Sequence, residues 1–130
     1  MGITVQRYVV KAAAWLEIVV GVIFVTLPDI PCLLVFGAKP ESVGRPLAHW
    51  VGVALIALGI ACLPSKAAES NRNAVLGLVV FNVGATILFA WVGIVTTHGF
   101  ALWPVVILHA VIAVALLWQF LTCSSPSPER

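Results

Sequence analysis

Four long apolar stretches make up most of this 130-residue chain. They cover residues 9–27, 47–63, 74–95 and 101–121. Each is close to the ~20 residues that a helix needs to cross the ~30 Å hydrocarbon core of a bilayer. A segment surrounded by lipid must satisfy its own backbone, so each stretch is expected to be a helix. The pattern predicts an all-α membrane protein with a four-transmembrane-helix bundle, in one domain over residues 1–123, before a Ser/Pro-rich flexible tail at 124–130.

The composition indicates which solvent surrounds the fold. Hydrophobic residues account for 62% of the chain and charged residues for 9%, whereas a soluble domain is about half apolar and about a quarter charged. So much apolar surface cannot be hidden inside a core of this size, and the lipid bilayer is therefore the expected partner of the outer faces. The net charge of +2 and the lack of a basic run argue against a nucleic-acid partner.

The basic residues fall mainly on one side of the predicted membrane. One side carries Arg7, Lys11, Lys66, Arg72 and Arg130, and the other carries Lys39 and Arg45. The positive-inside rule then predicts a multi-pass protein with both termini in the cytoplasm. The first stretch ends in Thr26-Leu27-Pro28-Asp29, which does not resemble a small-residue cleavage site, so we expect a permanent membrane anchor.

The longest loop, residues 28–46, contains an apolar segment that is too short to span. This segment covers residues 30–36. Asp29 is suited to cap a helix there, Pro31 to its first turn, and Gly37 to its end. The sequence therefore predicts a short interfacial helix in this first outer loop.

Four strongly polar side chains, one from each apolar stretch, form a candidate intramembrane polar site. They are Glu17, His49, Asn82 and His109. In hydrocarbon they are the most costly residues of the chain, so any function is sought there first. Most of them share a helix face with glycine or alanine, which allow helices to approach closely. We therefore expect these polar groups to turn toward the inside of the bundle.

Depth in the membrane singles out one pair. With a rise of ~1.5 Å per residue, Glu17 lies near mid-membrane and His109 about a third of the way in from the outer face. We therefore hypothesise a hydrogen bond between Glu17 and His109, which Asn82 could extend. This pair could serve the stability of the fold or the function of the protein, and both roles stay open. Alone, Asn82 fits interhelical hydrogen bonding. His49 beside Trp50 fits the aromatic belt at the interface.

The motifs of soluble-type catalysis are missing, so no catalytic residue is assigned and the chain is not expected to be an enzyme. His49 and His109 are candidate haem ligands, but they differ in depth by ~7 Å, and no cofactor is expected. Together with Glu17 they supply at most three metal ligands without a metal-binding spacing, so no metal is expected either.

The three cysteines give no metal or redox motif. They are Cys32, Cys62 and Cys123, and none belongs to a CxxC pair. Cys62 and Cys123 lie near the ends of apolar stretches and are expected to be small packing residues.

Several segments resemble the DoxX-type proteins, a loose group of small, largely uncharacterised bacterial four-span membrane proteins. The segments are Gly44-Arg45, Gly52 to Cys62, Phe81-Asn82, Leu102-Trp103-Pro104 and Leu108-His109. The resemblance covers roughly residues 33–117 and implies a shared fold and a bacterial inner (cell) membrane. It implies no activity, and Glu17 lies outside the matching segments.

Two functions follow as hypotheses. The first is a non-enzymatic subunit or accessory of a larger membrane complex, or a homo-oligomer, which suits the small size and the absence of a catalytic motif. The second is a proton- or small-molecule-handling protein, for transport or with a redox or quinone-type site, that uses Glu17, Asn82 and His109.

Overall fold

The computed structural model describes residues 2–63 and 72–122, and all of its regular elements are helices. They are α1 (Gly2–Thr26), α2 (Asp29–Phe36), α3 (Gly44–Cys62), α4 (Arg72–Val95) and α5 (Leu102–Thr122). Four of them, all except α2, are long and apolar enough to cross a membrane. The prediction of an all-α, four-helix membrane bundle is confirmed. The predicted loop around Lys66, Cys123 and the predicted tail at 124–130 lie outside the described residues.

Most of the observed helix limits lie close to the predicted ones. The largest difference is at α1, which begins at Gly2 rather than near residue 9, and α3 begins at Gly44 rather than near residue 47. Pro46 therefore lies in the first turn of the helix, where its missing N–H costs no hydrogen bond. The first helix, α1, ends at Thr26, two residues before Pro28. Proline cannot continue the interior of a helix.

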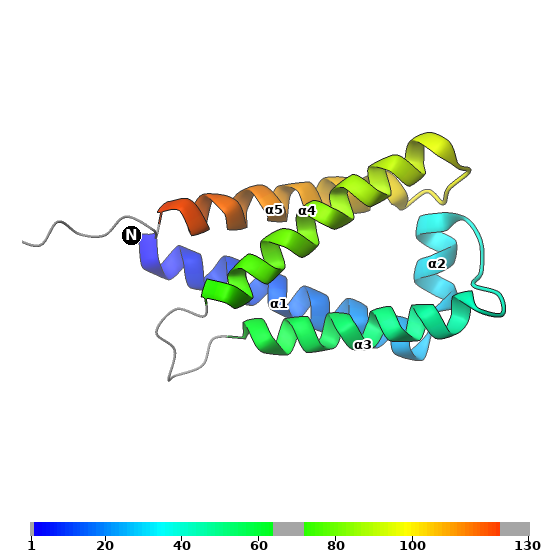
Figure 1. Cartoon of the computed structure of the whole chain (residues 1–130), viewed down its shortest axis with the longest axis horizontal. Coiled ribbons are helices and arrows are strands. Elements are labelled where there is room, and N and C mark those ends of the chain that lie inside the picture. Colours follow the sequence, from blue (N-terminus) through cyan, green and yellow to red (C-terminus); the bar gives the residue numbers. More distant parts are fainter. Residues whose placement is uncertain (1, 64–71, 123–130) are drawn as a thin grey trace, which may run out of the picture.

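The short helix α2 lies across one end of the bundle, nearly perpendicular to the four long helices (Figure 1). Gly37 ends it in the left-handed conformation, with φ at 73°, and donates its N–H to the Leu33 carbonyl at 3.0 Å. A short helix closed by Gly37 was predicted and is confirmed. The predicted capping role of Asp29 is wrong, because the side chain makes no cap and instead accepts a hydrogen bond from the Arg45 guanidinium at 2.7 Å.

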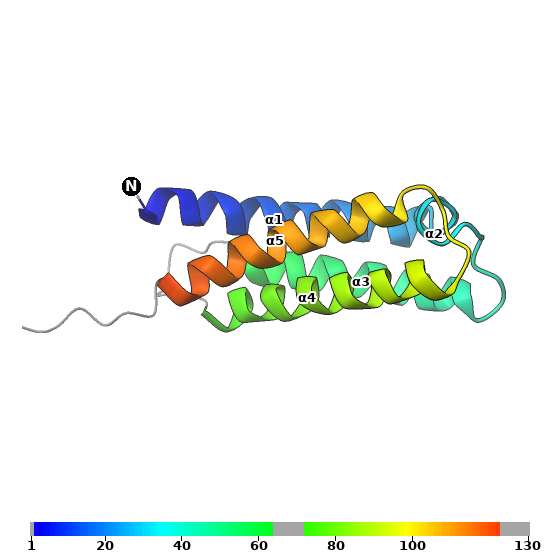
Figure 2. The same ribbon diagram turned by 90° about the horizontal axis from the view of Figure 1, so that it is seen from above.

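The long helices form two antiparallel pairs, α1 with α3 and α4 with α5 (Figure 1). Seen from above, α1 and α5 lie on one side and α3 and α4 on the other (Figure 2). The order around the bundle is therefore α1, α3, α4, α5. We call the end that carries α2 the α2 end, and the opposite end, where α1 begins, the N-terminal end.

Glycines bring the backbones of α1 and α3 into direct contact. A Cβ atom on Gly21 would lie 2.7 Å from the Gly52 carbonyl oxygen, and one on Gly52 would lie 2.7 Å from the Gly21 oxygen. Further along, a Cβ on Gly59 would lie 2.6 Å from the Ala14 oxygen. Only glycine fits at these three positions, and the pair is therefore tightly interlocked.

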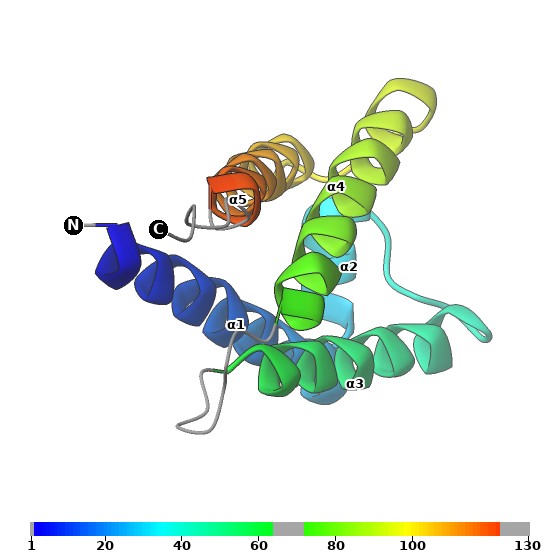
Figure 3. The same cartoon turned by 60° about the vertical axis from the view of Figure 1, so that its left-hand side comes forward.

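The two pairs meet at the N-terminal end through a buried apolar cluster, which we call the basal cluster. It comprises Ala13, Ala14, Cys62, Leu78, Val79 and Leu116. The Cys62 thiol also donates to the Ala74 carbonyl oxygen at 3.3 Å, which ties the end of α3 to the start of α4. From there α4 diverges from α3 toward the α2 end (Figures 1 and 3).

At the α2 end, α2 itself connects the pairs. The N–H groups of Gly99 and Ala101, in the connection between α4 and α5, donate to the carbonyls of Val35 and Leu34, each at 3.0 Å. A Cβ on Gly99 would collide with the Leu34 carbonyl. Glycine at position 99 thus permits this approach, and α2 is held to the far pair by backbone hydrogen bonds.

The interlock between α1 and α3 predicts a difference between glycines. Gly52→Ala should lower the free energy of unfolding by about 1–3 kcal/mol, because the added methyl has no room beside the Gly21 oxygen. The measurement is equilibrium unfolding of the purified protein in detergent, followed by circular dichroism.

The matched control is Gly84→Ala on α4, where an added Cβ meets nothing within 4 Å. This change should leave stability unchanged or slightly raise it, because alanine is the better helix former. Equal losses in the two variants would contradict the interlock.

Candidate intramembrane site

A side-chain hydrogen bond joins α4 to α5 inside the bundle. The amide oxygen of Asn82 lies 2.8 Å from Nδ1 of His109, and the Asn82 side chain is 0% exposed. Asn82 Nδ2 donates to the Leu78 carbonyl at 2.9 Å, and the Thr86 hydroxyl donates to the Asn82 carbonyl at 2.8 Å. Asn82 is therefore the centre of a small polar network on α4.

This network determines the proton positions on His109. Because the Asn82 amide nitrogen faces the Leu78 carbonyl, its oxygen faces His109 and can only accept. Nδ1 of His109 must then carry the hydrogen. In a neutral imidazole the other nitrogen, Nε2, keeps a lone pair and acts as an acceptor.

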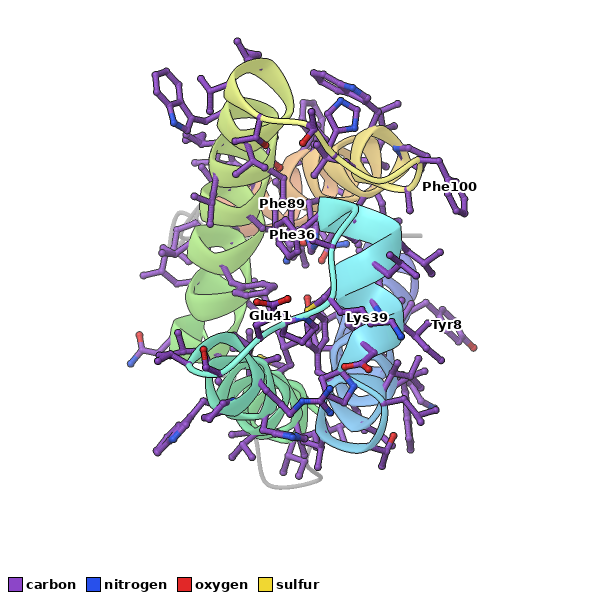
Figure 4. The ribbon with its side chains drawn as sticks, turned by 90° about the vertical axis from the view of Figure 1, so that its right-hand side faces the viewer. Tyr8, Phe36, Lys39, Glu41, Phe89 and Phe100 are labelled. Carbon is purple, nitrogen blue, oxygen red and sulfur yellow. The ribbon has the colours of Figure 1, made fainter. Side chains whose placement is uncertain are left out.

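Two aromatic rings of α4 lie beside the His109 ring. Its ring centre lies 5.8 Å from that of Phe81 and 5.8 Å from that of Phe89. Phe89 in turn contacts Phe36, at the end of α2, with ring centres 5.9 Å apart (Figure 4). A continuous row of rings therefore runs from α2 into the bundle as far as His109.

Glu17 is buried on α1 but takes no part in this network. Its side chain is 3% exposed, and Oε1 has no hydrogen-bond partner in the part of the chain that the structure describes. The predicted Glu17–His109 hydrogen bond is thus not formed. The physical reason is that α5 packs closely against α4, so Asn82 reaches His109 first, whereas α1 packs mainly against α3.

Glu17, Asn82 and His109 nevertheless occupy one level of the bundle, which we call the polar layer. Glu17 and Asn82 each lie one helical turn beyond a member of the basal cluster, Ala13 and Leu78 respectively. With a rise of ~1.5 Å per residue, this places Glu17 about 6 Å above the cluster, and His109 about 10 Å above Leu116. The three side chains therefore differ by only about one turn in height.

His49 lies apart from the polar layer. It is in the second turn of α3 at the α2 end, partly exposed, beside a Trp50 that is 72% exposed. The predicted position of His49 at the membrane interface stays a prediction. His98, in the connection between α4 and α5, is exposed and contacts Trp103 edge-on, with ring centres 6.2 Å apart.

The described residues give no group of three His, Cys, Asp or Glu side chains that could hold a metal ion. Cys62 is buried in the basal cluster, as predicted for a packing residue. Cys32, on α2, is also buried and free. Burial and the nearby Asp29 carboxylate raise the pKa of the Cys32 thiol, so this cysteine is a poor nucleophile.

Sequence reasoning missed three contributors to the site, namely Thr86, Phe89 and Phe36. A signal for the first two was available, because Thr86 and Phe89 follow Asn82 at spacings that share a helix face. For Phe36 there was none, since its contact depends on how α2 lies across the bundle.

Comparison with known proteins finds no match to this chain among protein-family models, curated proteins or solved structures. The DoxX-like resemblance therefore stays a prediction, and the properties of the site rest on its geometry.

The Asn82–His109 hydrogen bond should give a measurable coupling energy. In a double-mutant cycle of Asn82→Leu and His109→Phe, we expect a coupling of about 1 kcal/mol, the usual size for such bonds in membranes. The readout is the free energy of unfolding in detergent for the wild type, both single variants and the double variant.

The control cycle pairs Asn82→Leu with His98→Phe, since His98 is hydrogen-bonded only to its neighbour Gly99 among the described residues. That cycle should give a coupling near zero. The same small value in both cycles would mean that the Asn82–His109 bond contributes nothing to stability.

Proposed function

We propose that this chain is a non-enzymatic membrane protein that takes up a proton or a small molecule at Glu17, inside the bilayer. One observation carries the proposal: Oε1 of Glu17 is buried in a membrane-spanning helix without a hydrogen-bond partner among the described residues. On α4, the Asn82 amide and the Thr86 hydroxyl already donate to the backbone carbonyls of Leu78 and Asn82.

The buried carboxyl of Glu17 carries an energetic cost. An unpaired polar group in an apolar environment costs several kcal/mol, and an ionised one far more. Packing alone does not require such a group, since the helix contacts nearby are made by glycine and alanine. A proton or a bound molecule would relieve the cost, which supports a working role for Glu17.

The expected setting is a bacterial inner membrane, with both termini in the cytoplasm. The distribution of basic residues along the sequence supports this orientation. With α2 then on the outer side, Glu17 would lie between an outer end covered by α2 and an inner end closed by the basal cluster.

Labelling with dicyclohexylcarbodiimide, an apolar reagent that modifies protonated carboxyls within membranes, tests the proposal. In membranes containing the protein, mass spectrometry should find one adduct, on Glu17. Glu17→Gln should remove it, and Glu41→Gln, the same change in an exposed loop, should not. A folded wild type whose Glu17 stays unlabelled would contradict the proposal, because a sealed carboxyl cannot exchange a proton or a ligand.

A subunit role in a larger complex, or in a homo-oligomer, is the second candidate. It is supported by the open face of α4, where Gly84 has nothing within 4 Å and lies beside the exposed Ile87, Leu88 and Trp91. Small residues on an apolar helix face favour close contact with another helix.

If this second function holds, Gly84→Leu should reduce association at least about tenfold, because the side chain would separate the helices. The measurement is the mass of the detergent-solubilised particle by light scattering as a function of concentration. The control is Val114→Leu on the exposed face of α5. A particle of one chain in the wild type, without co-purifying protein, would rule out this candidate.

A further inference from the structure

We propose that the polar layer binds a protonated organic amine, whose ammonium group donates hydrogen bonds to Glu17 and to Nε2 of His109. This inference rests on the proposed uptake at Glu17 and names the chemical class of the molecule taken up. It follows from which hydrogen-bonding atoms the site leaves free, from the charges around it, and from the rings beside it.

The donors in and beside the polar layer are directed at protein carbonyls or at each other. The Asn82 amide donates to Leu78, the Thr86 hydroxyl to Asn82, and the Cys62 thiol to Ala74. His109 uses its Nδ1 hydrogen on Asn82. The atoms left over, Oε1 of Glu17 and Nε2 of His109, are acceptors. A complementary ligand therefore brings hydrogen-bond donors.

The charges around Glu17 indicate that the ligand is a cation. The basic side chains that the structure describes are Lys11, Lys39 and Arg45, all exposed. Arg45 pairs with Asp29 at the α2 end, and Lys39 lies in the loop that follows α2 (Figure 4). Lys11 lies on a different face of α1 from Glu17. A ligand that neutralises the Glu17 carboxylate must therefore supply its own positive charge.

The rings beside the layer suit the rest of such a molecule. Phe81 and Phe89 both contact the His109 ring, and Phe36 continues the row toward α2. Aromatic faces attract cations and offer apolar contact to a hydrocarbon body. A metal ion fits less well, because the described residues hold no group of three metal-binding side chains.

Three probes of similar size separate the charge from the N–H donors. Hexylammonium has both, propyltrimethylammonium has the charge without an N–H group, and 1-hexanol has no charge. Binding to the full chain in nanodiscs is measured by calorimetry and by protection of Glu17 from the carbodiimide, where a Glu17 hexylamide, formed when the amine traps the activated carboxyl, counts as labelling. Hexylammonium should bind and protect, and the other two should bind at least about tenfold more weakly.

Variants connect the binding to named side chains. Glu17→Gln should weaken hexylammonium binding by about 10- to 100-fold, the usual value of a hydrogen bond to a charged group. His109→Phe should weaken it less, with Glu17 still labelled by the carbodiimide. Glu41→Gln, far from the layer in an exposed loop, should leave the affinity unchanged.

Each opposite result overturns the inference. Equal affinity for hexylammonium and propyltrimethylammonium would exclude recognition through N–H donors, and equal affinity of wild type and Glu17→Gln would exclude Glu17. If Glu17→Gln fails to fold, the series of probes on the wild type still tests whether the site recognises an ammonium group through its N–H donors. If Glu17 is labelled but no probe binds or protects, the amine is excluded while uptake of a proton stands. Absence of labelling instead overturns the proposed function itself.

Discussion

Hydrocarbon offers no hydrogen bonds, so every polar group inside the four spanning helices must find its partner within the protein. This constraint accounts for the helices themselves, whose backbones are satisfied internally. It also accounts for the compact network of Asn82, in which the Asn82 amide, the Thr86 hydroxyl and Nδ1 of His109 are engaged. Against that background, Oε1 of Glu17 is a buried side-chain oxygen without a hydrogen-bond partner among the described residues.

The two helix pairs meet the same requirement by different means. In α1 and α3 the contact is made by backbone, because Gly21 and Gly52 have no side chain to separate the helices. In α4 and α5 a side-chain hydrogen bond crosses the interface between Asn82 and His109. Contacts between the pairs are fewer, and they are concentrated in the basal cluster and at α2. Glu17 lies between these two regions, one helical turn beyond Ala13 of the basal cluster.

Much of the fold could be predicted from the sequence, because length and apolarity alone identify helices that span a bilayer. Gly37 and the apolar residues before it likewise sufficed to predict α2. The partner of His109 could not be predicted. The sequence gives the depth of each residue in the membrane, but it does not show which helices are neighbours. The predicted cap by Asp29 was wrong for a related reason, because it also depends on which distant residues come close in the fold. The Asp29 carboxylate pairs with Arg45, which lies 16 residues further along the chain.

The backbone hydrogen bonds between α2 and the connection that contains Gly99 have a consequence for biogenesis. Their acceptors, Leu34 and Val35, are synthesised early, but their donors, Gly99 and Ala101, emerge only after α4. The α1–α3 hairpin has all of its own glycine contacts before that point. Assembly in the membrane therefore has a fixed order. The α1–α3 hairpin forms first, and α2 binds to the α4–α5 connection last, after the second hairpin has been inserted.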